Sequence, residues 1–133
     1  AEQVAFDMGF QKTNFDKLGA YQSQLFRAVR LVVDTGMHAF KWTREDAITY
    51  MASNTGMAMS DVVTEIERYI VWPGQATGYM IGQLEILRMR AKAEKALGKK
   101  FDVKAFHDVV LKGGAVPPTL LEEQVDAYIK ASK

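Results

Sequence analysis

The chain has 133 residues, of which 48% are hydrophobic and 25% charged, and its 17 Lys+Arg and 16 Asp+Glu give a formal net charge of +1. That length suits a single domain over residues 1–133 with material for a core, while the near-neutral charge argues against a nucleic-acid partner. The chain has no cysteine, which excludes disulfides, thiolate metal sites and cysteine nucleophiles. It also has no apolar run long enough for a membrane-spanning helix.

Apolar residues recur at spacings of three and four along almost the whole chain, and alternating strand patterns are missing. This pattern predicts an all-α fold, a bundle of about six to seven helices. The first three helices are expected at residues 2–8, 14–38 and 43–53. Asn14 is expected to cap the second helix, and Thr43 caps the third with Asp46 completing a capping box. The expected core face of the second helix consists of Leu18, Tyr21, Leu25, Val29 and Val32.

Prolines and glycines divide the second half of the sequence. Ser60 is expected to cap a fourth helix, which ends before Pro73 because the residue before a proline avoids the α region. Pro73 then opens a fifth helix, which would run to Leu97 and span roughly 37 Å. A sixth helix is expected between Asp102 and the glycines at 113–114, and a seventh follows the second proline of residues 117–118.

Two features point to neighbours outside this chain. A helix of roughly 37 Å is longer than the diameter of a small domain, about 30 Å. Around residues 25–33 the second helix is apolar on nearly every side, a pattern typical of a helix enclosed by a larger protein. A compact bundle with a projecting helix and a dimer interface explains both features equally well, so both interpretations stay open.

A group of polar residues on the second helix is a candidate site. Arg30, Asp34 and His38 lie four residues apart on one face, and Arg27 lies one turn earlier. Asp34 can accept a hydrogen bond from an arginine and orient the histidine, which would leave His38 able to donate to a substrate oxygen. A purely structural ion-pair network has the same spacing, and the spacing does not separate the two.

The predicted fifth helix begins with a glycine on each turn: Gly74, Gly78 and Gly82. Each glycine costs about 1 kcal/mol relative to alanine inside a helix, so a close neighbour is expected on that face. Gln75 and Tyr79 border this stripe, near a helix N-terminus that favours anionic groups. The face could contact a substrate, and ordinary helix packing is the other interpretation.

His107 lies at the edge of an apolar face in the predicted sixth helix, where a lone histidine is usually a packing residue. The chain has only two histidines and no HExxH motif. No metal site and no cofactor are therefore expected in this chain by itself. The motifs of serine hydrolases and nucleotide-binding enzymes are also missing.

Several stretches together resemble the end of a large bacterial family, the domain of unknown function 885 (DUF885): RLVVDTG at 30–36, RYI at 68–70, PGQA at 73–76, GY at 78–79 and FH at 106–107. The resemblance runs from about Ala1 to Ile129. It implies that this chain is the C-terminal part of a larger all-helical protein similar to gluzincin zinc metallopeptidases. Ala1 and Glu2 look like the end of a segment whose glutamate is the third zinc ligand, just upstream, so all three zinc ligands would be missing here.

The resemblance also implies roles for individual residues. Zinc is expected in the full-length protein, and this chain alone is expected to be inactive because hydrolysis needs a metal to activate water. Gluzincins supply a tyrosine and a histidine to the oxyanion from the part of the chain after the zinc ligands. The catalytic candidates are Tyr79 and His38, the substrate-binding candidates are Arg68, Gln75 and His107, and the supporting network is Arg27, Arg30 and Asp34.

The partners implied by the resemblance are the remainder of the full-length protein and a peptide substrate, and the implied location is the periplasm or cell envelope. A different function stays open beside this one. The chain could be a free-standing helical module for protein interaction, pairing two copies through exposed apolar faces.

Overall fold

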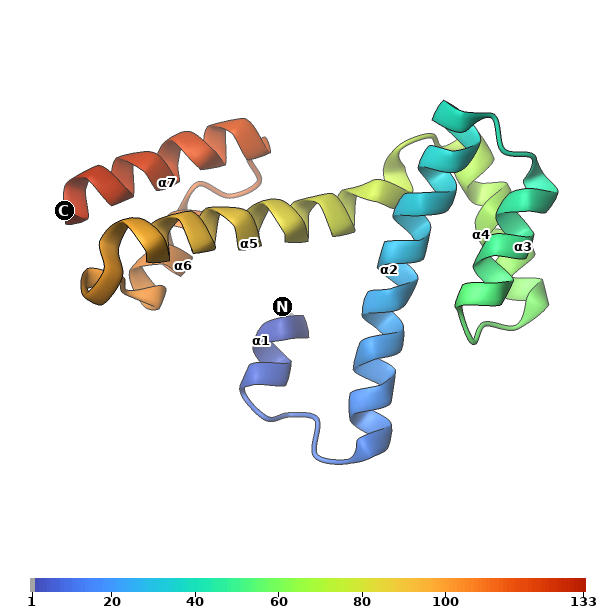
Figure 1. Ribbon diagram of the computed structural model, residues 1–133, viewed down its shortest axis with the longest axis horizontal. Helices are drawn as coiled ribbons and strands as arrows, with labels where there is room; N and C mark the ends of the chain where they lie inside the picture. Colours follow the sequence, from blue (N-terminus) through green and yellow to red (C-terminus); the bar gives the residue numbers. More distant parts are fainter. Residues whose placement is uncertain (1) are drawn as a thin grey trace. The chain divides into compact units, whose positions relative to one another are not determined.

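The computed structural model describes residues 2–133, and all regular structure among them is helical (Figure 1). The elements are α1 (Glu2–Asp7), α2 (Asn14–Phe40), α3 (Arg44–Asn54), α4 (Met59–Val71), the 3₁₀ turn η1 (Gln75–Thr77), α5 (Gly78–Leu97), the 3₁₀ turn η2 (Gly98–Lys100), α6 (Val103–Lys112) and α7 (Pro118–Ser132). The seven α-helices of the described residues confirm the predicted all-α fold. The predicted role of Ala1 lies outside the described residues.

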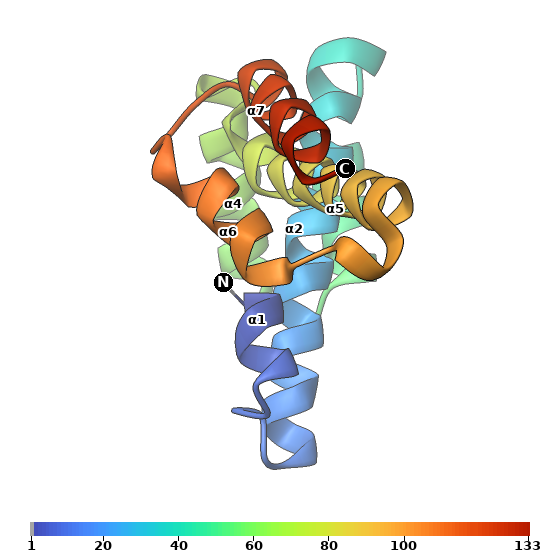
Figure 2. The ribbon, with the colours of Figure 1, turned by 90° about the vertical axis from the view of Figure 1, so that its left-hand side faces the viewer.

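Contacts within the chain form two compact units, Ala1–Met80 and Ile81–Lys133. In the first unit, α3 and α4 pack on the C-terminal half of α2 around Val33, Met51 and Ile66. In the second unit, α6 and α7 pack against the C-terminal part of α5 around Phe106 and Val125 (Figure 2). Each unit therefore has its own core, and the single domain over residues 1–133 stays a prediction.

Capping boxes fix the starts of α2 and α3. Thr13, and not Asn14 as predicted, caps α2: its Oγ1 accepts a hydrogen bond from Asp16 N at 3.1 Å, and the Asp16 carboxylate accepts from Thr13 N at 2.8 Å. Thr43 and Asp46 form the same box at α3, as predicted. These hydrogen bonds lower the pKa of both carboxyl groups.

Other helix starts agree only in part with the sequence. Asp102 caps α6 as predicted, since its carboxylate accepts from Lys104 N at 2.8 Å. The prediction that Ser60 caps α4 is wrong, because that helix begins at Met59 with Ala58 in the cap position and no side-chain cap.

The buried face of α2 differs from the prediction. Of the five residues expected in the core, only Val29 is buried, while Leu18, Tyr21, Leu25 and Val32 are all exposed. Residues 14–28 include no buried side chain, since α3 and α4 cover only the C-terminal half of α2. Helical spacing identifies apolar stripes, but it does not say which stripe this chain covers itself.

A proline–glycine turn delays the start of α5. Gly74 has φ +81° and ψ −18°, and Gln75 N donates to Trp72 O at 3.4 Å, which is the geometry of a type II turn with Pro73 and Gly74 at its centre. The fifth helix therefore begins at Gly78, not at Pro73, and its 20 residues span about 30 Å. No helix among the described residues combines the length and the apolar character that crossing a membrane requires.

The described residues do not supply the close neighbour expected for the glycine stripe. Gly74 lies in the turn, and a Cβ added at Gly74, Gly78 or Gly82 would meet no atom within 4 Å. Within the described residues the stripe therefore packs against nothing.

Candidate functional site

The turn at Trp72–Gln75 brings together side chains from α2, α4, η1 and the start of α5. Seven of the eight predicted site residues belong to this cluster through the contacts described below: Arg27, Arg30, Asp34, His38, Arg68, Gln75 and Tyr79. The eighth, His107, lies in the second unit on α6, half-buried, with its ring centroid 6.1 Å from that of Phe106. Its substrate-binding role stays a prediction.

Asp34 positions the turn. Its side chain is buried, and both carboxylate oxygens accept from Gly74 N, at 3.0 and 3.1 Å. The prediction that Asp34 accepts from an arginine and orients His38 is wrong, because Arg30 donates to Gln75 and His38 Nε2 contacts Tyr69 O. A buried carboxylate needs a donor, and the backbone N–H of the turn needs an acceptor, so this pairing satisfies both groups.

Arg30 is a buried cation surrounded mainly by aromatic rings. Its Nη2 donates to Gln75 Oε1 at 3.1 Å, while its Cζ lies 5.5–5.8 Å from the ring centroids of Phe26, Tyr69 and Tyr79. The aromatic faces offset part of the cost of burying the charge. In the described part of the chain no carboxylate lies within ion-pair distance of Arg30, and its buried Nε has no hydrogen-bond partner. The cluster therefore keeps positive character.

Gln75 joins Arg30 to a second arginine. Its Oε1 also accepts from Arg68 Nη1 at 3.2 Å, so one amide oxygen bridges two guanidinium groups. Arg68 Nη2 pairs with Glu65 Oε2 at 2.5 Å, and the Tyr69 hydroxyl donates to the same oxygen at 2.5 Å. The sequence analysis missed Glu65 and Tyr69, although Glu65 lies three residues before Arg68 and four before Tyr69, spacings that let one carboxylate reach both side chains.

Burial and hydrogen bonding act in opposite directions on Glu65. Burial raises its pKa, but the hydrogen bonds from Arg68 and Tyr69 outweigh burial and hold the pKa below its ordinary value of 4.5. Burial, and then the hydrogen bond to Glu65, raise the pKa of the Tyr69 phenol. Glu65 is therefore an ionised acceptor at neutral pH, and Tyr69 is a neutral donor.

Replacing Glu65 by glutamine is expected to lower the free energy of unfolding by about 1–2 kcal/mol at pH 7. Because the folded-state pKa of Glu65 lies below 4.5, its contribution is complete above that pH and is lost as the pH falls through the folded-state pKa. The gap between wild type and Glu65→Gln should therefore shrink at about pH 3. Urea unfolding followed by circular dichroism measures the difference in free energy of unfolding between the two proteins at each pH. Glu123→Gln, an exposed position on α7, is the control, and a gap that grows in acid would contradict this account.

Tyr79 is exposed, as are His38 and Gln75 among the members of the cluster. Its side chain is 61% exposed, and its ring lies beside two guanidinium groups, with Arg27 Cζ at 5.3 Å and Arg30 Cζ at 5.8 Å from the centroid. Arg27 is itself anchored, because its Nη1 donates to Ser23 Oγ at 2.6 Å and Ser23 O at 3.2 Å. The phenol oxygen has no hydrogen-bond partner among the described residues. The ring is thus oriented while the hydroxyl stays available to a ligand.

His38 has a different geometry. Its Nε2 lies 3.0 Å from Tyr69 O, in the last turn of α4. A carbonyl oxygen only accepts, so Nε2 carries the hydrogen and Nδ1 of the neutral ring is an acceptor. His38 is therefore engaged through Nε2 with the Tyr69 carbonyl, and this contact ties α2 to α4.

The described side chains do not fit a zinc ion. No group of three or more His, Cys, Asp or Glu residues among them could hold a metal. The two acidic groups of the cluster are already engaged, Asp34 with Gly74 N and Glu65 with Arg68 and Tyr69. What this arrangement offers is positive charge, one free phenol and an amide.

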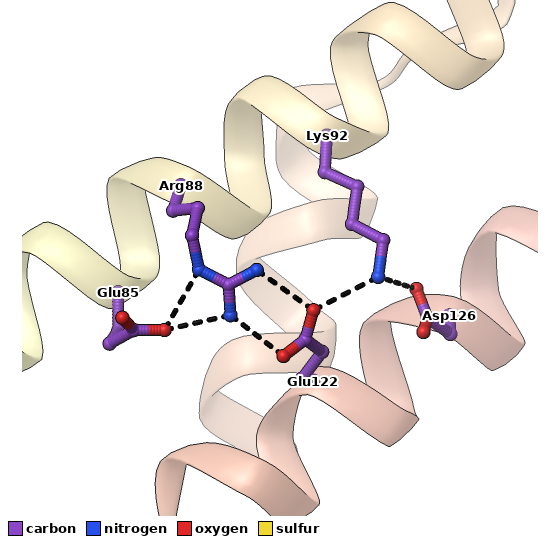
Figure 3. A network of polar contacts seen from close by, with 5 residues as sticks. All are labelled: Glu85, Arg88, Lys92, Glu122 and Asp126. Carbon is purple, nitrogen blue, oxygen red and sulfur yellow. Dashed lines mark hydrogen bonds and ion pairs between the residues drawn. The ribbon is translucent and has the colours of Figure 1, made fainter.

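The second unit carries a separate network of ion pairs between α5 and α7 (Figure 3). Glu122 lies between Arg88 and Lys92, with its oxygens 2.7 Å from Arg88 Nη2 and 3.0 Å from Lys92 Nζ, and the outer partners are Glu85 and Asp126. Hydrogen bonds from Arg88 and Lys92 lower the pKa of Glu122 to about 2. All these charges are paired and solvated, which is typical of a structural network at a helix interface.

The fold and the cluster define an all-helical segment with a basic, tyrosine-bearing site and no metal-ligand set among its described residues. Over residues 1–125 the chain matches the family described as "Bacterial protein of unknown function (DUF885)". The chain belongs to this family.

One solved structure extends the comparison. A protein from Colwellia psychrerythraea, described as a candidate lipoprotein, is 55% identical to this chain with a TM-score of 0.94. The similarity covers 97% of this chain and 22% of that chain, so this chain spans about a fifth of that protein's length. No curated protein matches the chain.

Proposed function

We propose that this chain is the C-terminal helical segment of a gluzincin-like zinc peptidase, and that the cluster around Tyr79 contacts the peptide substrate. The observation that carries the proposal is the exposed phenol of Tyr79, whose ring is held beside Arg27 and Arg30. In a larger protein this arrangement would present a fixed hydrogen-bond donor in a positively charged setting.

Such a donor suits the chemistry of peptide hydrolysis. Negative charge develops on the carbonyl oxygen as the tetrahedral intermediate forms, and a preorganised donor stabilises this charge more than it stabilises the uncharged substrate. Tyr79 would donate to that oxygen, while Arg68 and Gln75 would bind polar groups of the peptide. His38, whose Nε2 bonds to Tyr69 O, would keep α4 in place and contribute its free Nδ1 at most.

The ligands of the zinc ion would lie outside this chain, so its own side chains are assigned only to binding and hydrogen-bond donation. The description of the Colwellia protein as a candidate lipoprotein supports a location in the periplasm or cell envelope. His107 lies in the second unit and stays a substrate-binding candidate on the family resemblance alone.

A peptidase assay on two proteins tests this function. The longer protein that contains this segment is expected to hydrolyse peptides, to lose the activity to a chelator and to regain it with zinc, because a metal is needed to activate water. The 133-residue chain with added zinc is expected to hydrolyse nothing. Zinc-dependent activity from the short chain, or none from the zinc-loaded longer protein, would contradict the proposal.

A further inference from the structure

One side of α2, mostly in its first half, carries an apolar stripe that the described residues leave in solvent. Leu18, Tyr21, Leu25 and Val32 are 61%, 56%, 47% and 38% exposed, and their spacings of three, four and seven residues place them on one helical face. We call these four residues the α2 stripe. Contiguous exposed apolar surface of this kind marks an interaction site in a soluble protein.

The core of the first unit covers only part of this face of α2. Val29, which lies between Leu25 and Val32 on the same face, is buried against α3 and α4, and so is Val33 beside it. The short helix α1 reaches the stripe at Tyr21, whose ring centroid lies 5.6 Å from that of Phe6. The apolar face of α2 is therefore covered by α3 and α4 at Val29 and left exposed over most of its length, which is the pattern of a helix enclosed by a larger protein.

The similar structure indicates what covers the α2 stripe. The protein from Colwellia psychrerythraea contains this fold as 22% of its chain, which leaves the other 78% outside the similar segment. A segment with 55% identity and a TM-score of 0.94 keeps the same helices in a much longer polypeptide. The additional polypeptide is favoured over a separate partner molecule as the cover of the stripe, because two segments of one chain have a high effective concentration for each other.

We infer that the α2 stripe is an internal interface, covered in the longer protein by an apolar helical surface of the polypeptide outside this segment. The inference concerns assembly and not chemistry, so it holds or fails separately from the proposed peptidase activity. The competing interpretation is that a second copy of this chain covers the same stripe.

Cysteine labelling tests the inference directly. This chain has no cysteine, so Leu25→Cys introduces one thiol, which is compared in the 133-residue chain and in a longer protein freed of other cysteines. In the native longer protein, maleimide labelling is expected to be at least about 100-fold slower than in the same protein unfolded in urea. In the 133-residue chain, the native and unfolded rates should agree within about tenfold.

Two results would overturn the inference. One is fast labelling of the native longer protein, which would mean that the stripe stays exposed. The other is slow labelling of the 133-residue chain at high concentration together with a dimer in sedimentation, which would assign the stripe to a second copy. If Leu25→Cys prevents the longer protein from folding, Leu18→Cys at the more exposed end of the stripe takes its place.

Discussion

Replacing Tyr79 by phenylalanine in the longer protein is expected to lower kcat for peptide hydrolysis by about 100-fold or more, with little change in KM. The substitution keeps the ring beside Arg27 and Arg30 and removes only the exposed hydroxyl. A donor that acts on the developing oxyanion contributes to the transition state and not to the bound substrate, so its loss appears in kcat. Steady-state rates with a peptide substrate, at fixed zinc loading, measure both constants.

Tyr50→Phe is the matched control, because Tyr50 lies in the same unit and packs against Trp42 away from the cluster. Its kcat should stay within about twofold of wild type. If the two variants lose equal activity, or if Tyr79→Phe raises KM and leaves kcat unchanged, then Tyr79 is not the oxyanion donor. Unfolding curves of both variants separate lost chemistry from lost structure.

Replacing Gly36 by alanine is expected to destabilise the first unit by about 2–3 kcal/mol. Gly36 lies inside α2, and a Cβ there would stand 2.5 Å from Cδ2 and Cε3 of Trp42. The indole cannot retreat easily, because Trp42 N donates to Gly36 O at 3.0 Å and Lys41 turns the chain back with φ +59°. The extra methyl group therefore forces the helix end and the indole apart. Urea unfolding of the 133-residue chain measures the loss.

Gly19→Ala on the same helix supplies the control. A Cβ at Gly19 would meet no atom within 4 Å, so this substitution gains helix propensity and is expected to stabilise the chain by about 0.5–1 kcal/mol. The two variants make the same chemical change in the same helix, and only the contact with Trp42 differs. Equal stabilisation by both would mean that Trp42 does not pack on Gly36.

The sequence predicts much of the fold because its signals are local. Helical spacing gives the all-α fold, the Thr43–Asp46 box marks a helix start, and the glycines at 113–114 mark a helix end. Pro73 by itself predicts the start of a helix, whereas the Pro73–Gly74 pair favours a type II turn. The predicted start of α5 at Pro73 is wrong for this reason. Thr13 was overlooked although Thr13 and Asp16 have the same spacing as Thr43 and Asp46.

The sequence predicts which residues form the candidate site, but not which hydrogen bonds join them. Positions on single helix faces were enough to select Arg30, Gln75 and Tyr79, which the structure brings into contact. The bond from Gly74 N to Asp34 joins residues 40 positions apart, and nothing in the local spacing predicts it. The exposed α2 stripe was likewise assigned to the core, because spacing is the same whether the covering partner lies inside or outside the chain.

α2 is one continuous helix from Asn14 to Phe40, and this continuity ties together two parts of the molecule. Leu25 precedes Arg27 by two residues, so whatever fixes the first residue also fixes the direction in which the second points. Because an α-helix is stiff, a tilt or rotation of α2 at Leu25 also moves Arg27. Covering the α2 stripe in the longer protein, as inferred above, would therefore also fix how Arg27 and Arg30 lie beside Tyr79.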